Sequence, residues 1–355
     1  MNHCPRRAPG RLTLHVTLLA ALLALASAAL AQIGGDPATL ADIASVEAES
    51  LGDGTFRTAA GLVVEPVVRN GALFSLQGRS EVFEDADAQD LAALVGAATG
   101  FGGDIEQPLL DFLERALPEL AGAGPSAVGI ERFRLTLDVA GASAPFDVRF
   151  TLALAEVPEE AFPEARHAKG PADAAVVIRE FSDFQCPACR RFNLDVMPEL
   201  EAVLMPRGDV RIEYHHFPLI TSFANSLRAA EASECVVDAN ADDPEAFWSY
   251  KLALYEHQPA WAPLARPDET FVQIAADAGL ETQGVAACLA EGVHAERLQD
   301  DYRAALALQL RGTPSVFVGG FQIDNIAALS AYELAIYYLE AFGAGAGADA
   351  APAAD

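Results

Sequence analysis

Residues 180–189 read Glu-Phe-Ser-Asp-Phe-Gln-Cys-Pro-Ala-Cys and place two cysteines between an apolar segment and a helical pattern. The apolar run Ala175–Phe181 contains β-branched residues, which predicts a buried strand. Pro187 favours the first position of a helix, so the first cysteine lies where a helix begins. Unpaired backbone N–H groups and the helix dipole stabilise a thiolate at such a position. The spacing therefore predicts Cys186 as a nucleophile of lowered pKa, and Cys189, one turn further on, as the thiol that attacks a mixed disulfide.

The segments after the cysteines follow the order of a thioredoxin core with an insertion. The helix from Pro187 is expected to run toward Leu204 with a kink at Pro198, and to be followed by a second strand. Further on, a long helical stretch precedes two short strands and a last amphipathic helix. The second strand is expected at Val210–Phe217 and the helical stretch at Thr221–Leu310. The two short strands are expected at Thr313–Val318 and Phe321–Ile323, and the last helix at Ala328–Phe342. The predicted fold class is therefore α/β, a thioredoxin fold with a helical insertion.

Residues 32–157 are expected to form a small α+β domain ahead of this core. Leu62–Val68 and Ala72–Leu76 flank an Asn-Gly pair, which is a strong hairpin signal. Helical patterns cover Asp36–Ser50, Ala88–Thr99 and Gln107–Ala121, and alternating patterns predict strands at Phe133–Val139 and Phe146–Leu154. This part of the sequence holds no cysteine and no histidine, and its role is open. Prolines and charges over 158–172 indicate a linker to the core domain at 173–342.

Both ends of the chain are expected to lie outside these domains. Residues 1–31 resemble a cleavable secretory signal, with three arginines, an apolar run over Leu12–Leu25 and the pattern Ala29-Leu30-Ala31. An uncleaved anchor is the alternative, although the apolar run is short for a membrane span. Cleavage near Ala31 would place the protein in the periplasm or elsewhere outside the cytoplasm. The tail 343–355 consists mainly of glycine, alanine and aspartate and is expected to be disordered.

The composition limits the partners and directs attention to the cysteines. The net charge of −28 and the pI near 4.4 exclude nucleic acid and anionic lipid surfaces as natural partners. Cys4 would leave with the signal, so Cys186, Cys189, Cys235 and Cys288 remain. In an oxidising compartment we expect a structural disulfide between Cys235 and Cys288, with two buried unpaired thiols as the alternative. No cofactor and no metal site is expected, because the neighbouring His215 and His216 point to opposite faces of their strand.

The cysteine stretch resembles the active-site segment of the DsbA-like thioredoxin family. The resemblance continues at Phe217-Pro218-Leu219 and at Gly312-Thr313-Pro314, and the helical insertion occupies the place of that family's helical domain. It covers about residues 165–342 and does not reach the N-terminal domain. It implies that Cys186 is the nucleophile, that Cys189 is the resolving thiol, and that the bond between Thr313 and Pro314 is cis and packs against the dithiol.

The resemblance also implies a role for Glu180 and an activity. Glu180 lies where the family carries a buried acid that relays the proton of the resolving thiol; a surface glutamate is the alternative. The implied activity is that of an exported thiol–disulfide oxidoreductase acting as an oxidant on cysteines of exported proteins. A disulfide isomerase or reductase, or a metal-relay or binding module, remains an alternative. A membrane or soluble redox partner is expected, as is a homodimer formed through the N-terminal domain.

Overall fold

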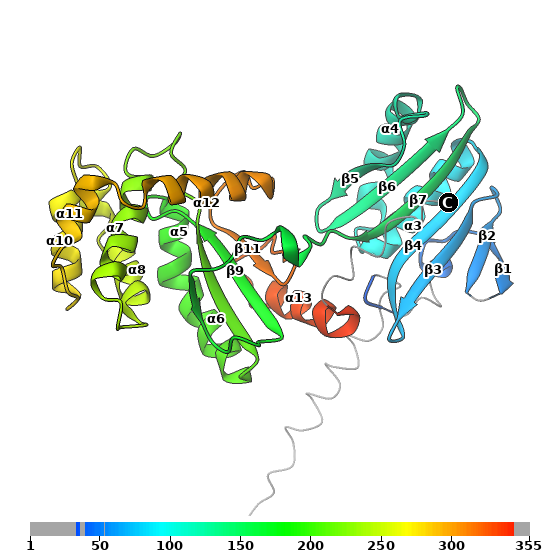
Figure 1. Cartoon of the computed structure of the whole chain (residues 1–355). Coiled ribbons are helices and arrows are strands. Elements are labelled where there is room, and N and C mark those ends of the chain that lie inside the picture. Colours follow the sequence, from blue (N-terminus) through cyan, green and yellow to red (C-terminus); the bar gives the residue numbers. More distant parts are fainter. Residues whose placement is uncertain (1–32, 36–39, 53, 344–355) are drawn as a thin grey trace, which may run out of the picture. The chain divides into compact units, whose positions relative to one another are not determined.

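The computed structural model describes residues 33–35, 40–52 and 54–343 (Figure 1). The expected signal at 1–31 and nearly all of the expected tail lie outside these residues. The described chain divides into two compact units. The first contains residues up to Ser126 together with Leu137–Phe150, and the second contains Ala127–Thr136 and the residues from Thr151 on. No helix in the described part of the chain is long and apolar enough to cross a membrane.

A seven-stranded sheet of order β1-β2-β3-β4-β7-β6-β5 dominates the N-terminal half. The strands are Ala48–Gly52, Thr55–Thr58, Val63–Arg69, Ala72–Phe83, Ser126–Ile130, Phe133–Ala140 and Phe146–Leu154 for β1 to β7. The Asn-Gly hairpin is confirmed: β3 pairs antiparallel with β4, and Asn70 and Gly71 take positive φ values of 50° and 83°. The sheet is larger than expected because β1, β2 and β5 lack a strong alternating pattern.

The helix expected over Asp36–Ser50 is wrong at its C-terminal end. The helix α2 covers only Leu40–Ile43, and Ser45 adopts a left-handed φ of 55° that ends it. The following Ala48–Gly52 forms the exposed strand β1, which pairs with β2. Pairing with a neighbouring strand has overridden a weak helical propensity here. Residues 36–39 lie outside the described residues.

Two helices of this half agree with the sequence pattern. The helix α3 (Asp85–Thr99) begins where the Asp87 carboxylate accepts a hydrogen bond from the N–H of Glu84, and it ends at Gly100, whose φ is 80°. The helix α4 (Gly103–Leu120) buries a stripe of leucines at every fourth position, Leu109, Leu113 and Leu117. It packs against α3.

The second unit contains a five-stranded sheet of order β12-β11-β9-β10-β8. The strands β8 to β12 are His167–Lys169, Val176–Ser182, Val210–His216, Ser315–Val318 and Phe321–Gln322. The strands β9 and β10 are parallel, whereas β11 runs antiparallel to β9 and β8 runs antiparallel to β10. This β-α-β and β-β-α arrangement is a thioredoxin fold. The core domain is proposed to cover 173–342. The strand β8, which lies in the expected linker, adds an edge strand to its sheet.

The helix after the cysteines is interrupted rather than simply kinked. It consists of α5 (Pro187–Arg191), a π-helical turn η3 (Phe192–Val196) and α6 (Met197–Leu204). The interruption lies ahead of Pro198, at Asn193, whose side-chain amide donates to the carbonyl of Cys189 at 3.0 Å. Such π-helical turns are frequent at functional sites.

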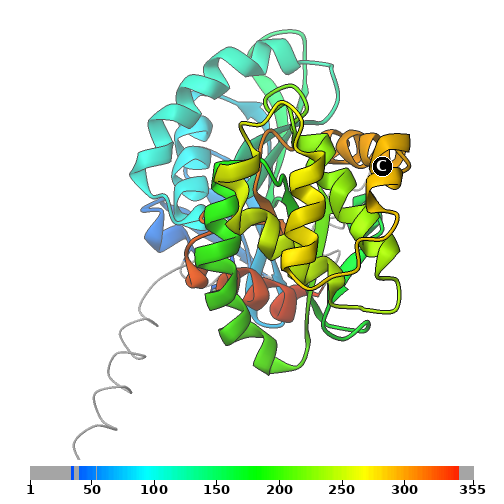
Figure 2. The same ribbon diagram turned by 90° about the vertical axis from the view of Figure 1, so that its left-hand side faces the viewer.

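The helical insertion is confirmed, and Figure 2 views its helices in front of the second sheet. It comprises α7 (Ser226–Ala239), α8 (Ala246–Glu256), α9 (Gln258–Trp261), α10 (Asp268–Asp277), α11 (Val285–Glu291) and α12 (Ala295–Ala307). Large buried side chains such as Tyr250, Trp261 and Phe271 form a core that also contains Cys186 and Cys189. A disulfide joins Cys235 of α7 to Cys288 of α11, with a Cα–Cα distance of 5.8 Å. The last helix, α13, covers Leu329–Phe342.

Candidate active site

Cys186 lies at the N-cap of α5, between the end of β9 and the first helical residue, Pro187. Its backbone carbonyl accepts the first helical hydrogen bond, from the N–H of Arg190 at 3.1 Å. The Sγ atom therefore faces backbone N–H groups that have no helical partner. Both Cys186 and Cys189 are free thiols and both are buried. The strand, loop and helix thus bring the two cysteines together as the sequence predicts.

The two thiols have opposite acidities. A hydrogen bond from Cys189, assisted by the backbone N–H groups of Cys189 and Ala188, lowers the pKa of Cys186 to about 5 despite its burial. Burial and the neighbouring Cys186 raise the pKa of Cys189 well above its ordinary value. At neutral pH the pair therefore holds one thiolate and one proton. Cys186 is therefore a nucleophile, whereas Cys189 stays protonated and unreactive until it is deprotonated.

The bond between Thr313 and Pro314 is cis and lies beside the dithiol. Cys186 Sγ lies 3.4 Å from the carbonyl oxygen of Thr313, to which it can donate only while it is protonated. The strand β11 begins at the next residue, Ser315, which is paired with Phe181 of β9. This pairing brings the Thr313–Pro314 segment to the sulfur from more than 100 residues away, since the Sγ–carbonyl contact spans 127 positions.

Glu180 is fully buried rather than at the surface, so the surface alternative is wrong. Its carboxylate accepts hydrogen bonds from Lys251 Nζ at 2.9 Å and from the side-chain amide of Asn193. Asn193 also bonds the carbonyl of Cys189 and so connects the acid to the active-site helix. Burial lowers the pKa of Lys251, and Glu180 opposes that shift. A lone lysine among the apolar residues of α8 was the signal in the sequence for this partner.

A second acid, Asp183, was missed in the sequence. Its side chain is buried and accepts hydrogen bonds from the N–H groups of Gln185 and Leu219, each at 2.7 Å, and from the Ser226 hydroxyl at 2.6 Å. Its own backbone N–H lies 3.5 Å from Cys189 Sγ. Burial raises the pKa of Asp183 to about 6, although the three hydrogen bonds oppose this. An acidic residue in the short loop before the cysteines was its only signal.

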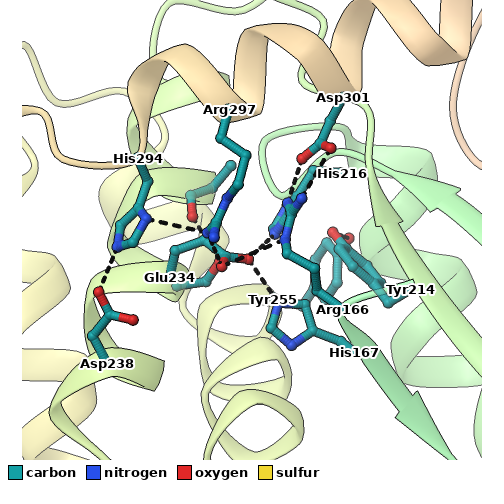
Figure 3. A network of polar contacts seen from close by, with 12 residues as sticks. Arg166, His167, Tyr214, His216, Glu234, Asp238, Tyr255, His294, Arg297 and Asp301 are labelled. Atoms are coloured by element: carbon teal, nitrogen blue, oxygen red, sulfur yellow. Dashed lines mark hydrogen bonds and ion pairs between the residues drawn. The ribbon is translucent and has the colours of Figure 1, made fainter. Parts of the chain in front are cut away.

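The residues best suited to hold a metal lie apart from the thiols, around Glu234 of α7 (Figure 3). His167 Nε2 and His216 Nε2 lie 2.6 and 2.8 Å from the same oxygen, Glu234 Oε1. Arg297 donates to the other oxygen, and Arg166 Nε lies 3.7 Å from it. As expected for neighbours on a strand, His215 points the other way and stacks on Phe181.

This Glu234 cluster is an ion-pair network rather than a metal centre. Both imidazoles are engaged with the carboxylate, and two guanidinium groups already supply its countercharge. A divalent cation would have to enter against these two positive charges, at a cost that grows with burial. The network instead ties β8, β10, α7 and α12 together, because its members come from all four elements.

We expect the free energy of unfolding to fall when the pH is lowered below about 6.5, the ordinary pKa of histidine. Burial lowers the pKa of His216, so the unfolded chain takes up a proton that the folded protein refuses. Burial alone would raise the pKa of Glu234, but hydrogen bonds from His167 and His216 hold it well below its ordinary value. The stabilisation from Glu234 is present above about pH 4.3 and is lost as the pH falls further.

Urea unfolding at several pH values measures this effect. At neutral pH, Glu234→Gln should lose about 1–3 kcal/mol, because it weakens the acceptor that two buried imidazoles and two partly exposed guanidinium groups share. Its stability should also decline less steeply than that of the wild type below about pH 4. The exposed ion pair of Asp300 with Arg303 provides the control, and Asp300→Asn should cost less than about 1 kcal/mol. Equal losses in the two variants would contradict the buried-network interpretation.

Comparison with known proteins finds a family that this part of the chain resembles. A family model described as thioredoxin matches residues 163–336, a range that holds both cysteines, Glu180 and the Thr313–Pro314 bond. This part of the chain resembles the DsbA-like thioredoxin family. The model begins within the linker expected from the sequence, which agrees with β8 belonging to the DsbA-like part. The N-terminal half lies outside the match.

Individual relatives match about half of the chain. The chain is 26% identical over 162 residues to disulfide bond formation protein D of Bacillus subtilis, covering 44% of this chain and 69% of that protein. It is 30% identical over 172 residues to Na(+)/H(+) antiporter NhaA 3 of Salinispora tropica, covering 48% of this chain but 24% of that protein. The oxidised BdbD structure from Bacillus subtilis is similar, with 24% identity, a TM-score of 0.43, and coverage of 51% of this chain and 94% of that one.

Proposed function

We propose that this chain is an exported thiol–disulfide oxidoreductase that oxidises pairs of cysteines in exported proteins. The observation that carries the proposal is the opposite acidity of two adjacent thiols, with the pKa of Cys186 lowered to about 5 and that of Cys189 raised. An inert structural bridge has no need of such a difference. A helix start that stabilises the Cys186 thiolate makes this sulfur both a ready nucleophile and a good leaving group.

The reaction runs through one mixed disulfide. A substrate thiolate attacks Cys186 Sγ of the disulfide form, the bond between the two active-site sulfurs breaks, and Cys189 leaves and takes up a proton. A second substrate thiolate then attacks the substrate sulfur of the mixed disulfide and releases Cys186 as a thiolate. The substrate has lost two electrons and two protons, and the active site has gained the two electrons.

Other residues of the site have proposed roles in this reaction. Thr313 and Pro314 would offer backbone to an extended substrate peptide beside Cys186, because proline lacks an N–H and leaves the preceding carbonyl accessible. Glu180 would exchange the proton of Cys189, with Lys251 compensating its charge. Asn193 holds the Glu180 carboxylate beside the backbone carbonyl of Cys189. The Cys235–Cys288 disulfide would brace the helical insertion without taking part in the chemistry.

The stabilised Cys186 thiolate supports a flow of electrons from the substrate to the protein. Stabilising Cys186 as a thiolate favours the reduced pair over the disulfide, and this preference is the oxidising power. A reductase would need a less stabilised thiolate. Export is supported by the signal-like sequence at 1–31, and we propose a site of action in the periplasm or elsewhere outside the cytoplasm. We also propose that a redox partner reoxidises Cys186 and Cys189, and that the protein forms a homodimer through its N-terminal domain.

Oxidation of a reduced two-cysteine peptide, with glutathione as the redox buffer, tests the function. The oxidised protein should transfer its disulfide to the peptide, and Cys186→Ser should abolish the transfer. Asp195→Asn, an exposed change further along the same helix, should leave it intact. Denaturant midpoints of the two redox forms test the direction, and the reduced form should be the more stable. A clearly more stable oxidised form would make the protein a reductant.

A further inference from the structure

The carboxylate of Asp183 joins three separate segments around the active site. Its Oδ1 accepts from the N–H of Gln185, the residue just before Cys186, at 2.7 Å. Its Oδ2 accepts from the N–H of Leu219, in the loop after β10, and from the hydroxyl of Ser226, the first residue of α7. One buried acid therefore positions the cysteine turn and the entrance to the helical insertion together.

Asp183 also lies against both sulfurs. Its backbone N–H is 3.5 Å from Cys189 Sγ, and its carbonyl accepts a hydrogen bond from the N–H of Cys186 at 3.2 Å. A negative charge on Cys186 raises the pKa of the Asp183 carboxyl, in addition to the larger effect of burial. The charges of a thiolate and a carboxylate thus oppose one another inside the same turn.

The surroundings of Asp183 do not neutralise it. In the described part of the chain, no lysine, arginine or histidine forms an ion pair or hydrogen bond with its carboxylate. Burial holds the pKa of Tyr214 on β10 and that of Tyr255 on α8 well above the ordinary range, so both remain uncharged. Cys189 keeps its proton in the reduced protein, since its pKa is also raised. The thiolate of Cys186 is therefore the charge to which Asp183 responds.

We propose that Asp183 is a redox-linked positioning residue, which takes up a proton when the Cys186–Cys189 disulfide is reduced and releases it when the disulfide reforms. The proposal rests on the proposed function. Oxidation of a dithiol substrate releases two protons; Cys189 binds one of them, and near pH 6 Asp183 binds part of the other while the rest passes to solvent. Protonation weakens the acceptor strength of the carboxyl, so the hydrogen bonds from Leu219 and Ser226 loosen in the reduced protein.

The coupling is reciprocal. If the Cys186 thiolate raises the pKa of Asp183, an ionised Asp183 must raise the pKa of Cys186 by the same amount. Removing the charge should therefore lower the pKa of Cys186 and remove an inflection near pH 6 from its alkylation profile. A purely structural role for Asp183 would change stability without moving either pKa.

Carbon-13 NMR of the side-chain carboxyl in the full-length wild-type protein tests the proposal directly. The pKa of Asp183 should be higher in the reduced form than in the disulfide form, by on the order of one unit. Asp183→Asn assigns the resonance. Asp195→Asn, an exposed change in the π-helical turn before α6, serves as the control. Hydrogen exchange of the Leu219 amide should be faster in the reduced protein below about pH 6 than in the oxidised protein. An Asp183 pKa that is the same in both redox forms would overturn the proposal.

Two variants separate charge from structure. Asp183→Asn should lower the pKa of Cys186 and flatten the alkylation profile near pH 6, whereas Ser226→Ala, which keeps the charge but removes one hydrogen bond, should raise the pKa of Asp183. If Asp183→Asn does not fold, the comparison of redox forms in the wild type still decides. A wild type without disulfide transfer would sink the proposed function, whereas an active wild type with an unresponsive Asp183 would sink the present inference alone.

Discussion

In the reduced protein, iodoacetamide is expected to modify Cys186 with a rate that is half-maximal near pH 5 and to leave Cys189 unmodified. The thiolate is the reacting form, and an ordinary cysteine with a pKa of about 8.5 would be about a thousandfold less ionised at that pH. Cys189 is fully buried and holds its proton, so its reaction should be undetectable under the same conditions. We expect this difference in reactivity between Cys186 and Cys189 to be the largest effect in the thiol chemistry of the protein.

The hydrogen bond from Cys189 is the largest favourable contribution to the low pKa of Cys186, which provides an internal test. Cys189→Ala removes that donor while keeping the helix start, so the pKa of Cys186 should rise toward its ordinary value. Mass spectrometry of the alkylated protein after proteolysis identifies which cysteine has reacted at each pH. A Cys186 profile centred near pH 8.5 in the wild type would refute the catalytic assignment.

The Cys235–Cys288 disulfide should contribute the second large effect, this time on stability alone. It closes a loop over 53 positions, for which the chain-entropy model gives roughly 4 kcal/mol. Both cysteines lie inside helices, α7 and α11, and so lack the unpaired N–H groups that lower the pKa of Cys186. Replacing both by alanine should therefore lower the free energy of unfolding and leave disulfide transfer by the folded protein unchanged.

Thiol counting supplies the control for this bridge. With Cys186 and Cys189 replaced by serine, the chain from Gln32 on should show no free thiol when it is unfolded without a reductant. Urea unfolding of the bridged protein and of the double alanine variant then measures the contribution of the crosslink. Two free thiols in the count would mean that Cys235 and Cys288 are unpaired, and that they act as small apolar side chains.

Short-range signals were enough to predict the order of elements in the DsbA-like part. A strand that ends just before a cysteine, followed by proline at the first helical position, specifies the helix start at Cys186 whatever lies elsewhere. The Asn-Gly pair between two apolar runs specifies the β3–β4 hairpin in the same way. Where the pattern was weak, as in the exposed strand β1, the prediction was wrong, because pairing with β2 decided the conformation.

The electrostatics of the site depend on contacts between distant segments. Lys251 meets Glu180 across 71 positions, Ser226 meets Asp183 across 43, and His167 meets Glu234 across 67. Each pair forms because packing the helical insertion against the sheet buries both members, and a buried charge must then find a partner. The sequence by itself determined which sulfur would be the nucleophile, since that depends on one turn of helix. Only the tertiary structure decided which acids and bases surround it, because side chains so far apart in the chain come together only when the core has formed.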